Sequence, residues 1–345
     1  MEKVTPISSR KSDHVKINLN QDVQSGIGNG LDRFRFTHEA LPEIDFDVIN
    51  LETTLFGKKL AAPILISSMT GGTRESQRIN QVLAEAAQTA NIPMGVGSMR
   101  AALEDPKLIH TFNIRKYAPN ALLFANLGAI QLNNGMDPQD CLRAIEMIAA
   151  DALILHINPL QEALQSQGNT NFSGLSGKIK QVCQNSPVPV IVKEVGWGIS
   201  PNAARILKKC GVAAIDVAGA GGTSWSQVEM FRAEHDMIRS VAADFKDWGI
   251  STADSILNVK QSAPGVVIFA SGGITNGLEI AKCLALGASL VGLAGPFLKA
   301  AVQSVESVLQ LIQTLEYGLK TTLFATGSTK LGELQNKLHL TSNPE

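Results

Sequence analysis

Short apolar runs alternate with longer, more polar segments along most of the chain. Eight such runs occur between residues 64 and 293, and apolar and polar side chains do not alternate within them. Uninterrupted apolar character is typical of parallel strands that are buried on both faces. The predicted strands are Ile64–Ser67, Met94–Gly97, Leu122–Ala125, Leu153–His156, Val190–Lys193, Ala214–Val217, Val266–Ala270 and Leu290–Leu293.

The segments between these runs carry apolar residues three and four positions apart, which is the spacing of an amphipathic helix. The clearest stripes are Ile79, Val82, Leu83 and Ala86; Leu142, Ile145, Ile148 and Ala149; and Leu278, Ile280, Ala281 and Leu284, with Gly287 placed to cap the last helix. Eight strand–helix units close naturally into a barrel with the helices outside. The pattern therefore predicts an α/β fold, a (β/α)8 TIM barrel, with an open doubly wound sheet as the alternative.

Two segments fall outside this alternation. The first forty residues show no strand–helix repeat, so we assign residues 1–45 to an N-terminal extension and residues 46–345 to the barrel. The segment from Gly219 to Gly249, after the sixth predicted strand, is too long for a simple loop between a strand and a helix. We expect it to be an insertion that serves as a lid or in contacts between copies of the chain.

Composition narrows the class of protein. The 345 residues carry a formal net charge of −1, which gives no sign of a nucleic-acid partner. No apolar signal segment opens the chain, and the longest apolar stretch is interrupted by Pro296, so we expect no membrane span and a cytoplasmic protein. Widely spaced cysteines without a C-x-x-C pair predict ordinary thiols in a reducing compartment. They are Cys141, Cys183, Cys210 and Cys283.

Polar and glycine residues follow the predicted strands at their C-terminal ends. Functional groups of a (β/α)8 barrel gather at this face, and a purely structural barrel would not need such a series. The strand ends in question are 67–72, 98–100, Asn126, 156–162, 193–194, 219–224, 271–274 and 294–295. We therefore predict the functional site here.

The glycine-rich ends of the last two strands predict a phosphate site. Ser271-Gly272-Gly273 and Ala294-Gly295 offer backbone N–H groups with no bulky side chain in the way. Plain turn glycines are the alternative, but a pair of such ends after strands seven and eight favours phosphate. The pattern does not name the phosphorylated ligand.

Three charged features suggest further chemistry. Lys193 ends a buried strand, where an unpaired ammonium is costly, so we expect it to neutralise an anion or form a Schiff base; an ion pair with Glu194 is the alternative. Glu162 follows the fourth strand, where a metal or proton role competes with a plain surface position. The cluster Arg10-Lys11-Ser12-Asp13-His14 would, from charge alone, be a solvated tail.

Taken together, these strings resemble the type 2, FMN-dependent isopentenyl-diphosphate delta-isomerase family. The matching strings are Arg10-Lys11-x-Asp13-His14 and residues 67–72, 95–100, 156–162, 192–200, 216–225 and 271–274. The segment His-x-Asn-Pro-x-Gln-Glu is highly specific, whereas the glycine-rich strings are shared with many FMN barrels. The resemblance implies an isomerase of isoprene biosynthesis that interconverts isopentenyl and dimethylallyl diphosphate with reduced FMN and Mg²⁺, and with NADPH as the reductant.

The resemblance also implies roles for individual residues. FMN would be held by Met69, Thr70, Gly71, Ser98, Asn126, Lys193, Thr223, Gly272, Gly273, Ala294 and Gly295. The substrate would be surrounded by Arg10, Lys11, Ser98, Arg100, His156, Asn158 and Gln161, with the N-terminal extension contributing to this site. Gln161, Lys193 and His156 would serve catalysis, and Glu162 would bind Mg²⁺. One departure from the family is Met99, where Gln is usual.

Moving a double bond requires protonation and deprotonation of carbon without net redox change. The strand ends offer no obvious carboxylic acid deep in the pocket apart from Glu162, which the metal would occupy, so the reduced flavin itself, at N5 or N1, is the expected acid and base.

Other readings of the sequence predict different chemistry. A 2-hydroxyacid oxidase, which also uses FMN, needs a His base and an Arg clamp where this chain has Ala220 and Thr223. The inosinate/guanylate oxidoreductases need a nucleophilic cysteine in an active-site loop, and no cysteine here lies at a strand end. A non-catalytic flavin-binding barrel would need neither Gln161-Glu162 nor the basic leader. We further expect a homo-oligomer, a tetramer or an octamer.

Overall fold

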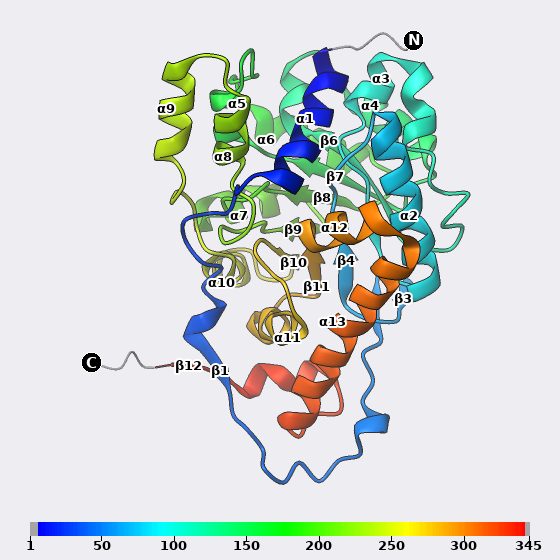
Figure 1. Ribbon diagram of the computed structural model, residues 1–345, viewed down its shortest axis with the longest axis vertical. Helices are drawn as coiled ribbons and strands as arrows, with labels where there is room; N and C mark the ends of the chain where they lie inside the picture. The colour runs from blue at the N-terminus through cyan, green and yellow to red at the C-terminus, as the bar shows by residue number, and fades with distance from the viewer. Residues whose placement is uncertain (1–5, 342–345) are drawn as a thin grey trace.

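The computed structural model describes the backbone of residues 6–341 and the side chains of residues 11–341. Its centre is a closed barrel of parallel strands in the order β10-β11-β4-β5-β6-β7-β8-β9 (Figure 1). Every one of the eight predicted strands is present, two of them with the predicted ends and the others with ends that differ by at most three residues, so the predicted (β/α)8 barrel is confirmed and the open sheet is wrong. The strands are β4 (Ile64–Ile66), β5 (Met94–Gly95), β6 (Leu123–Gly128), β7 (Ala152–His156), β8 (Val190–Lys193), β9 (Ala214–Asp216), β10 (Val267–Ser271) and β11 (Leu290–Leu293).

Helices surround the barrel and bury their apolar stripes against it (Figure 1). They are α2 (Arg74–Ala90), α3 (Arg100–Glu104), α4 (Pro138–Met147), α5 (Pro159–Leu164), α6 (Leu175–Asn185), α7 (Pro201–Cys210), α10 (Thr252–Ser262), α11 (Gly277–Leu286), α12 (Gly295–Gln303) and α13 (Val305–Ala325). Helix α2 shows how the sequence specifies them. The side chain of Thr73 caps its first turn by accepting a hydrogen bond from the Ser76 N–H, and Ile79 and Leu83 are buried on its inner face.

The predicted helical stripes are confirmed with two exceptions. Helix α4 ends at Met147, so Ala149 lies beyond it and is exposed. Leu278 and Ile280 are two positions apart in α11, so their side chains lie on nearly opposite sides of the helix. Ile280 is buried, and Leu278 is 47% exposed. Gly287 caps α11 with a φ of 126°, as its position predicts.

Apolar side chains close the end of the barrel that lies opposite the C-terminal strand ends. The antiparallel hairpin of β2 (Thr53–Leu55) and β3 (Lys58–Leu60) contributes Leu55 and Leu60 to the same apolar cluster as the inward-facing side chains of the barrel. Within that cluster, the rings of Phe124 and Phe269 stack with centroids 6.2 Å apart. This core fills the barrel beneath the C-terminal strand ends and leaves that face available for a site.

The two predicted additions to the barrel are present. We call all the residues between β9 and α10 the inserted segment. It contains two helices, α8 (Trp225–Arg232) and α9 (Asp236–Asp244). The described part of the N-terminal leader opens with α1 (Pro6–Asn20), which lies over the C-terminal strand ends beside α8 (Figure 1). The leader then descends along the barrel to β1 (Phe34–Phe36), which pairs antiparallel with β12 (Leu338–Leu340) near the other terminus. The boundary at residue 45 stays a prediction.

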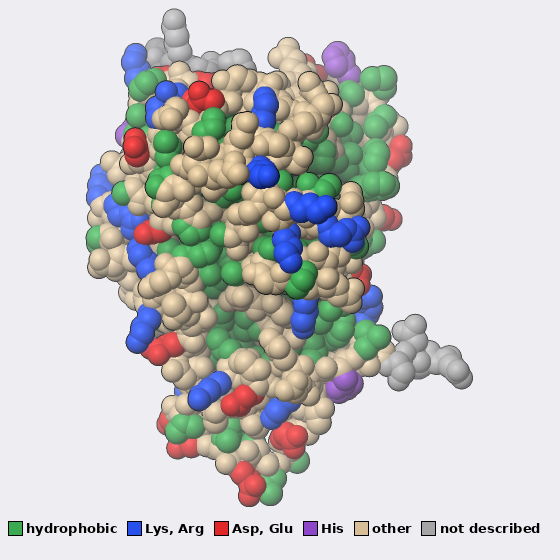
Figure 2. All heavy atoms as spheres, turned by 180° about the vertical axis from the view of Figure 1, so that it is seen from behind, with side chains coloured by type: hydrophobic (Ala, Val, Ile, Leu, Met, Phe, Trp, Pro, Cys, Tyr) green, Lys and Arg blue, Asp and Glu red, His purple; other side chains and the backbone are tan. Residues whose placement is uncertain are grey.

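Surface properties agree with the balanced charge of the sequence. On the face shown in Figure 2, basic and acidic side chains are interspersed with apolar and uncharged ones. Within residues 6–341, no helix combines the length and the apolar character that crossing a membrane requires. The four cysteines are free thiols, three buried and Cys183 partly exposed.

Candidate active site

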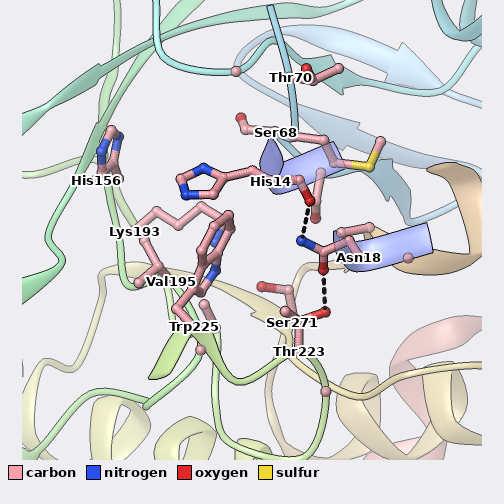
Figure 3. Close-up of a pocket in the computed structure, with 18 of the residues that line it drawn as sticks. His14, Asn18, Ser68, Thr70, His156, Lys193, Val195, Thr223, Trp225 and Ser271 are labelled. Atoms are coloured by element: carbon pink, nitrogen blue, oxygen red, sulfur yellow. Dashed lines mark hydrogen bonds between the residues drawn. The ribbon is translucent and has the colours of Figure 1, made fainter. Parts of the chain in front are cut away.

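A cavity of about 560 Å³ opens at the C-terminal end of the barrel, beneath helix α1 (Figure 3). Residues that follow all eight barrel strands line it. The site residues predicted from sequence lie together in its wall: Lys11, Met69, Thr70, Gly71, Ser98, Arg100, Asn126, His156, Asn158, Gln161, Glu162, Lys193, Thr223, Gly272, Gly273, Ala294 and Gly295. The side chain of Arg10 lies outside the described residues.

The loop after β10 is built on glycine for a steric reason. Gly272 and Gly273 have φ values of 112° and 71°, a region that disfavours residues with a Cβ. A Cβ at Gly272 would also overlap the carbonyl of Gly219, and one at Gly273 would overlap the carbonyl of Gly221. The loops after β9 and β10 therefore touch backbone to backbone, and they line the cavity side by side.

Helix α12 completes this end of the cavity. It begins at Gly295, beside which the space that a Cβ would occupy is open, and no side chain caps its first turn. Uncapped N–H groups and the partial positive charge at a helix N-terminus favour an anion. Together with Gly272 and Gly273, these groups form the candidate phosphate site that the sequence predicts.

Lys193 lies in the cavity wall, and its ammonium group donates a hydrogen bond of 2.6 Å to the backbone oxygen of Glu194. The Glu194 carboxylate accepts hydrogen bonds from the N–H groups of residues 195, 196 and 197, at 2.7, 2.7 and 2.5 Å. Among the described residues Lys193 forms no ion pair with Glu194, so that alternative is wrong.

Two buried carboxyls belong to neighbours of Lys193: Glu194 follows it in the chain, and Asp216 lies on the adjacent strand. Burial raises the pKa of Glu194 to about 7, although the three amide hydrogen bonds oppose this shift. Asp216 pairs with Lys193 in the β8–β9 register, and Ser271 donates a hydrogen bond of 2.6 Å to Oδ1 of Asp216. Burial also raises the pKa of Asp216, against the opposing charge of Lys193 and the hydrogen bonds from Ser271 and Ala218.

The segment after β7 forms a hydrogen-bonded group at one side of the cavity. Nδ1 of His156 lies 2.8 Å from Oδ1 of Asn126 on the neighbouring strand. The amide of Asn158 donates to Oε1 of Gln161 at 3.0 Å and to Oε1 of Glu162 at 3.1 Å. Proline at the start of α5 turns the chain into a short helix here, and the buried side chains of Gln161 and Glu162 both line the cavity.

Glu162 is the one carboxylate among the described residues that line the cavity. Its Oε2 accepts a hydrogen bond of 2.6 Å from the N–H of Asn169. The described residues contain no group of three or more acidic, histidine or cysteine side chains arranged to hold a metal. A metal at Glu162 would therefore need most of its ligands from water and from the bound substrate, which is how Mg²⁺ is commonly held.

The basic leader is not a solvated tail. The ammonium group of Lys11 donates a hydrogen bond of 2.7 Å to the backbone oxygen of Ser98 and lies 4.9 Å from the centre of the Phe112 ring. Figure 3 shows His14 pointing into the cavity towards His156, with Trp225 and Lys193 beside it. The rings of His14 and Trp225 meet edge to face, with centroids 5.0 Å apart.

Sequence reasoning missed four residues of this site. His14 and Trp225 belong to strings that carried the family resemblance, but they were given no role. Asn18 hydrogen-bonds Thr223, and buried Glu229 on α8 contacts both His14 and Gln161 at 3.1 Å. Nothing local in the sequence marked these last two.

Solved structures with the same fold include a soluble mutant of the membrane-associated (S)-mandelate dehydrogenase from Pseudomonas putida. It matches with a TM-score of 0.68 and 18% identity, covering 97% of this chain and 99% of that one. An oxidised active mutant of (S)-mandelate dehydrogenase matches with the same TM-score and 17% identity, covering 96% and 99%. At these identities the likeness concerns the fold alone.

The sequence comparisons are more specific. The FMN-dependent dehydrogenase family matches residues 26–108 and 129–341. The isopentenyl-diphosphate delta-isomerase of Nostoc sp. is 54% identical over 329 residues, covering 95% of this chain and 94% of its own. The enzyme of the same name from Rickettsia prowazekii is 49% identical over 325 residues, covering 94% and 95%. The chain therefore belongs to the isopentenyl-diphosphate delta-isomerases of the FMN-dependent type.

Proposed function

We propose that the protein interconverts isopentenyl diphosphate and dimethylallyl diphosphate with reduced FMN and Mg²⁺ bound, and that NADPH reduces the flavin. The observation that carries this proposal is that one cavity contains a glycine-rich phosphate site, Lys193 and the segment 156–162, all beneath the leader helix. Flavin binding alone would require only the phosphate site and Lys193. The segment 156–162 supplies groups for a second, diphosphate-bearing ligand.

The residues present fit FMN. Gly272, Gly273 and the start of α12 offer N–H groups to its phosphate, and Lys193 offers a cation to the anionic, reduced ring system. The buried hydroxyls of Ser67 and Ser68 have no hydrogen-bond partner among the described atoms, and both line the cavity. Unpaired buried hydroxyls are costly, so they support a polar ligand at this place. In this proposal Met69, Thr70, Gly71, Ser98, Asn126, Thr223, Ala294 and Gly295 complete the FMN site.

When bound, reduced FMN would supply the proton donor and acceptor for the alkene. The protein's own groups are poorly suited to that task. Both oxygens of Glu162 already accept hydrogen bonds, and Gln161 does not titrate. Gln161 is held at both ends of its amide, by Asn158 and by Glu229, so it can orient the hydrocarbon part of the substrate. The inserted segment and α1 cover this region and help to exclude water.

The diphosphate would bind on the side of the cavity beneath α1. Lys11 and Arg100 supply positive charge there, and we place Arg10 in the same role. His156 and Asn158 offer hydrogen-bonding groups from the β7 end. Glu162 would hold Mg²⁺ through one carboxylate while phosphate oxygens and water fill the other positions. These positive groups bind the diphosphate and keep it from leaving as positive charge develops on the hydrocarbon.

An assay of the purified protein tests the proposal. With FMN, NADPH, Mg²⁺ and isopentenyl diphosphate under anaerobic conditions, dimethylallyl diphosphate should form. If protein that carries bound FMN formed no dimethylallyl diphosphate, the proposed isomerase activity would be rejected. Oxidation of a 2-hydroxy acid would instead support an oxidase, but the methyl side chain of Ala220 cannot serve as the base that such an enzyme needs.

We also propose that the protein forms a tetramer or an octamer. The inserted segment exposes apolar side chains, and Met237 and Trp248 are 71% and 58% exposed. Exposed apolar residues grouped on one segment are typical of contact surfaces. Light scattering should show an assembly that Met237→Asp weakens, and a wild-type monomer at all concentrations would reject the proposal.

A further inference from the structure

The lower part of the leader lies against the two glycine loops of the candidate phosphate site. The N–H of Ser25 donates to the backbone oxygen of Gly222 at 2.7 Å, and the N–H of Ser224 donates to the backbone oxygen of Val23 at 2.8 Å. Gln24 and Thr223 form an antiparallel bridge between these bonds. The leader thus pairs with the loop after β9 as a short strand would.

Asn29 makes the corresponding connection to the loop after β10. Its Nδ2 donates to the backbone oxygen of Gly273 at 2.9 Å and to Oε1 of Glu279 at 2.9 Å. Its Oδ1 accepts from the N–H of Leu31 at 3.0 Å, and its backbone oxygen accepts from the N–H of Ala253 at 3.0 Å. One partly buried amide therefore joins the leader, the glycine loop and α11.

The packing around Asn29 is tight. A Cβ on Gly221 would overlap the backbone of Asn29, so the leader is in van der Waals contact with the β9 loop here. Glu279, the second acceptor of Asn29, also accepts from the N–H of Thr275 at 2.7 Å. Both ends of the segment from Gly273 to Thr275 are thereby fixed by one hydrogen-bonded chain.

The carbonyl of Gly273 and the N–H of Ile274 belong to the same peptide bond. In a trans peptide the C=O and the following N–H point in opposite directions. Asn29 lies behind the loop, outside the cavity wall, whereas Gly273 and Ile274 line the cavity. A Gly273 carbonyl held outward by Asn29 therefore turns the N–H of Ile274 to the inner side, where a phosphate would accept its hydrogen bond.

We propose that Asn29 is a positioning residue for the phosphate of FMN, and that leader docking and phosphate binding stabilise each other through it. The inference rests on the FMN site proposed above and adds a residue of the leader to it. Linkage between two binding equilibria is reciprocal. If the docked leader increases the affinity for FMN by some factor, bound FMN must therefore increase the equilibrium constant for leader docking by the same factor. The same leader carries Lys11 and His14, so cofactor binding would also organise the substrate side of the cavity.

Riboflavin, which lacks the phosphate, separates this role from a general loss of stability. Dissociation constants of FMN and riboflavin would be measured by quenching of flavin fluorescence in the wild type, Asn29→Ala, Asn29→Asp and Arg33→Ala. Asn29→Asp keeps the shape and the acceptor for Leu31 but loses both donors. Arg33 tethers the leader to Asp254 at 2.6 Å without contacting Gly273, so Arg33→Ala is the matched control.

We expect both Asn29 variants to weaken FMN binding by about fivefold to tenfold, the effect of one lost hydrogen bond, and to leave riboflavin within about twofold. Arg33→Ala should change neither. Equal weakening of both flavins, or no weakening of either, would overturn the role of Asn29. A wild type that binds FMN no more tightly than riboflavin would overturn the phosphate site and the inference together. If the wild type binds FMN more tightly than riboflavin but shows no isomerase activity, only the proposed reaction is rejected.

Proteolysis of the leader provides a second measurement on correctly folded protein. Saturating FMN should slow cleavage after Lys11 and Lys16 more than saturating riboflavin does, and Asn29→Asp should reduce that difference. Equal protection of the wild type by both flavins would contradict the linkage.

Discussion

The side-chain amide of Gln161 donates a hydrogen bond to Oε1 of Glu229 at 3.1 Å. Nε2 of His14 lies 3.1 Å from the same oxygen, and Arg232 binds the other oxygen at 2.5 Å. Burial alone would raise the pKa of Glu229, but the hydrogen bonds from His14 and Gln161 and the nearby charges outweigh it and lower the pKa. An ionised Glu229 thus joins the leader, the inserted segment and the β7 end above the cavity.

Replacing this carboxylate should affect turnover more than cofactor binding. We expect Glu229→Gln to lower kcat by about tenfold or more, because charge-assisted hydrogen bonds that orient Gln161 and His14 are lost. The dissociation constant of FMN should stay within about twofold. Glu234→Gln, at an exposed position just beyond α8, is the control. An unchanged kcat, or an equal loss in the control, would contradict the role of Glu229.

Lys11→Ala should raise KM for isopentenyl diphosphate by about tenfold with a smaller change in kcat, since a cation that faces a diphosphate contributes mainly to binding. Lys16→Ala removes an exposed charge from the same helix, outside the cavity wall, and should leave KM unchanged. Steady-state kinetics at saturating Mg²⁺ measures both. If Lys11→Ala matched the wild type, the leader would have no part in substrate binding.

Glu162→Gln should increase the Mg²⁺ concentration needed for half-maximal activity by about tenfold or more, because an amide oxygen is a weaker Mg²⁺ ligand than a carboxylate. The titration is made at fixed FMN and substrate concentrations. Glu146→Gln on the exposed face of α4 is the control. A variant with an unaltered Mg²⁺ requirement would refute the metal assignment.

Lys193→Met should make the bound flavin harder to reduce. Loss of the cation destabilises the anionic reduced form more than the oxidised one, so we expect the midpoint potential to fall by roughly 30 mV or more. Lys299 on α12 also lines the cavity, and Lys299→Met tests whether any nearby cation has the same effect. Equal shifts in the two variants would remove the special role of Lys193.

Glu194 should impose a pH dependence on stability. Its pKa is about 7 in the folded protein and about 4.5 when unperturbed. Between these values the folded state binds more protons than the unfolded chain, so this contribution is complete below pH 4.5 and is lost as the pH rises towards 7. Glu194→Gln cannot titrate, and its Tm should therefore rise relative to the wild type between about pH 5 and pH 8. A difference that stays constant with pH would contradict the shift.

Much of the fold could be predicted because its information is local. The run Leu153–Leu155 is apolar without alternation, which is typical of a strand covered on both sides. Once eight such strands are parallel and close into a barrel, their C-terminal ends lie at one face by geometry. That is why Lys193, Gly272 and Gly295, more than twenty residues apart in the chain, could be placed in one site from sequence.

The partners of those residues depended on tertiary structure. Glu229 meets His14 across 215 positions, and Asn29 meets Gly273 across 244. Neither the leader nor the inserted segment has a repeat that fixes its path over the barrel, so no local pattern indicates which side chains it brings together. The sequence by itself determined the barrel and the face that carries the site. Only tertiary packing decided how the leader and the inserted segment close that face, because their positions follow from many weak contacts between distant parts of the chain.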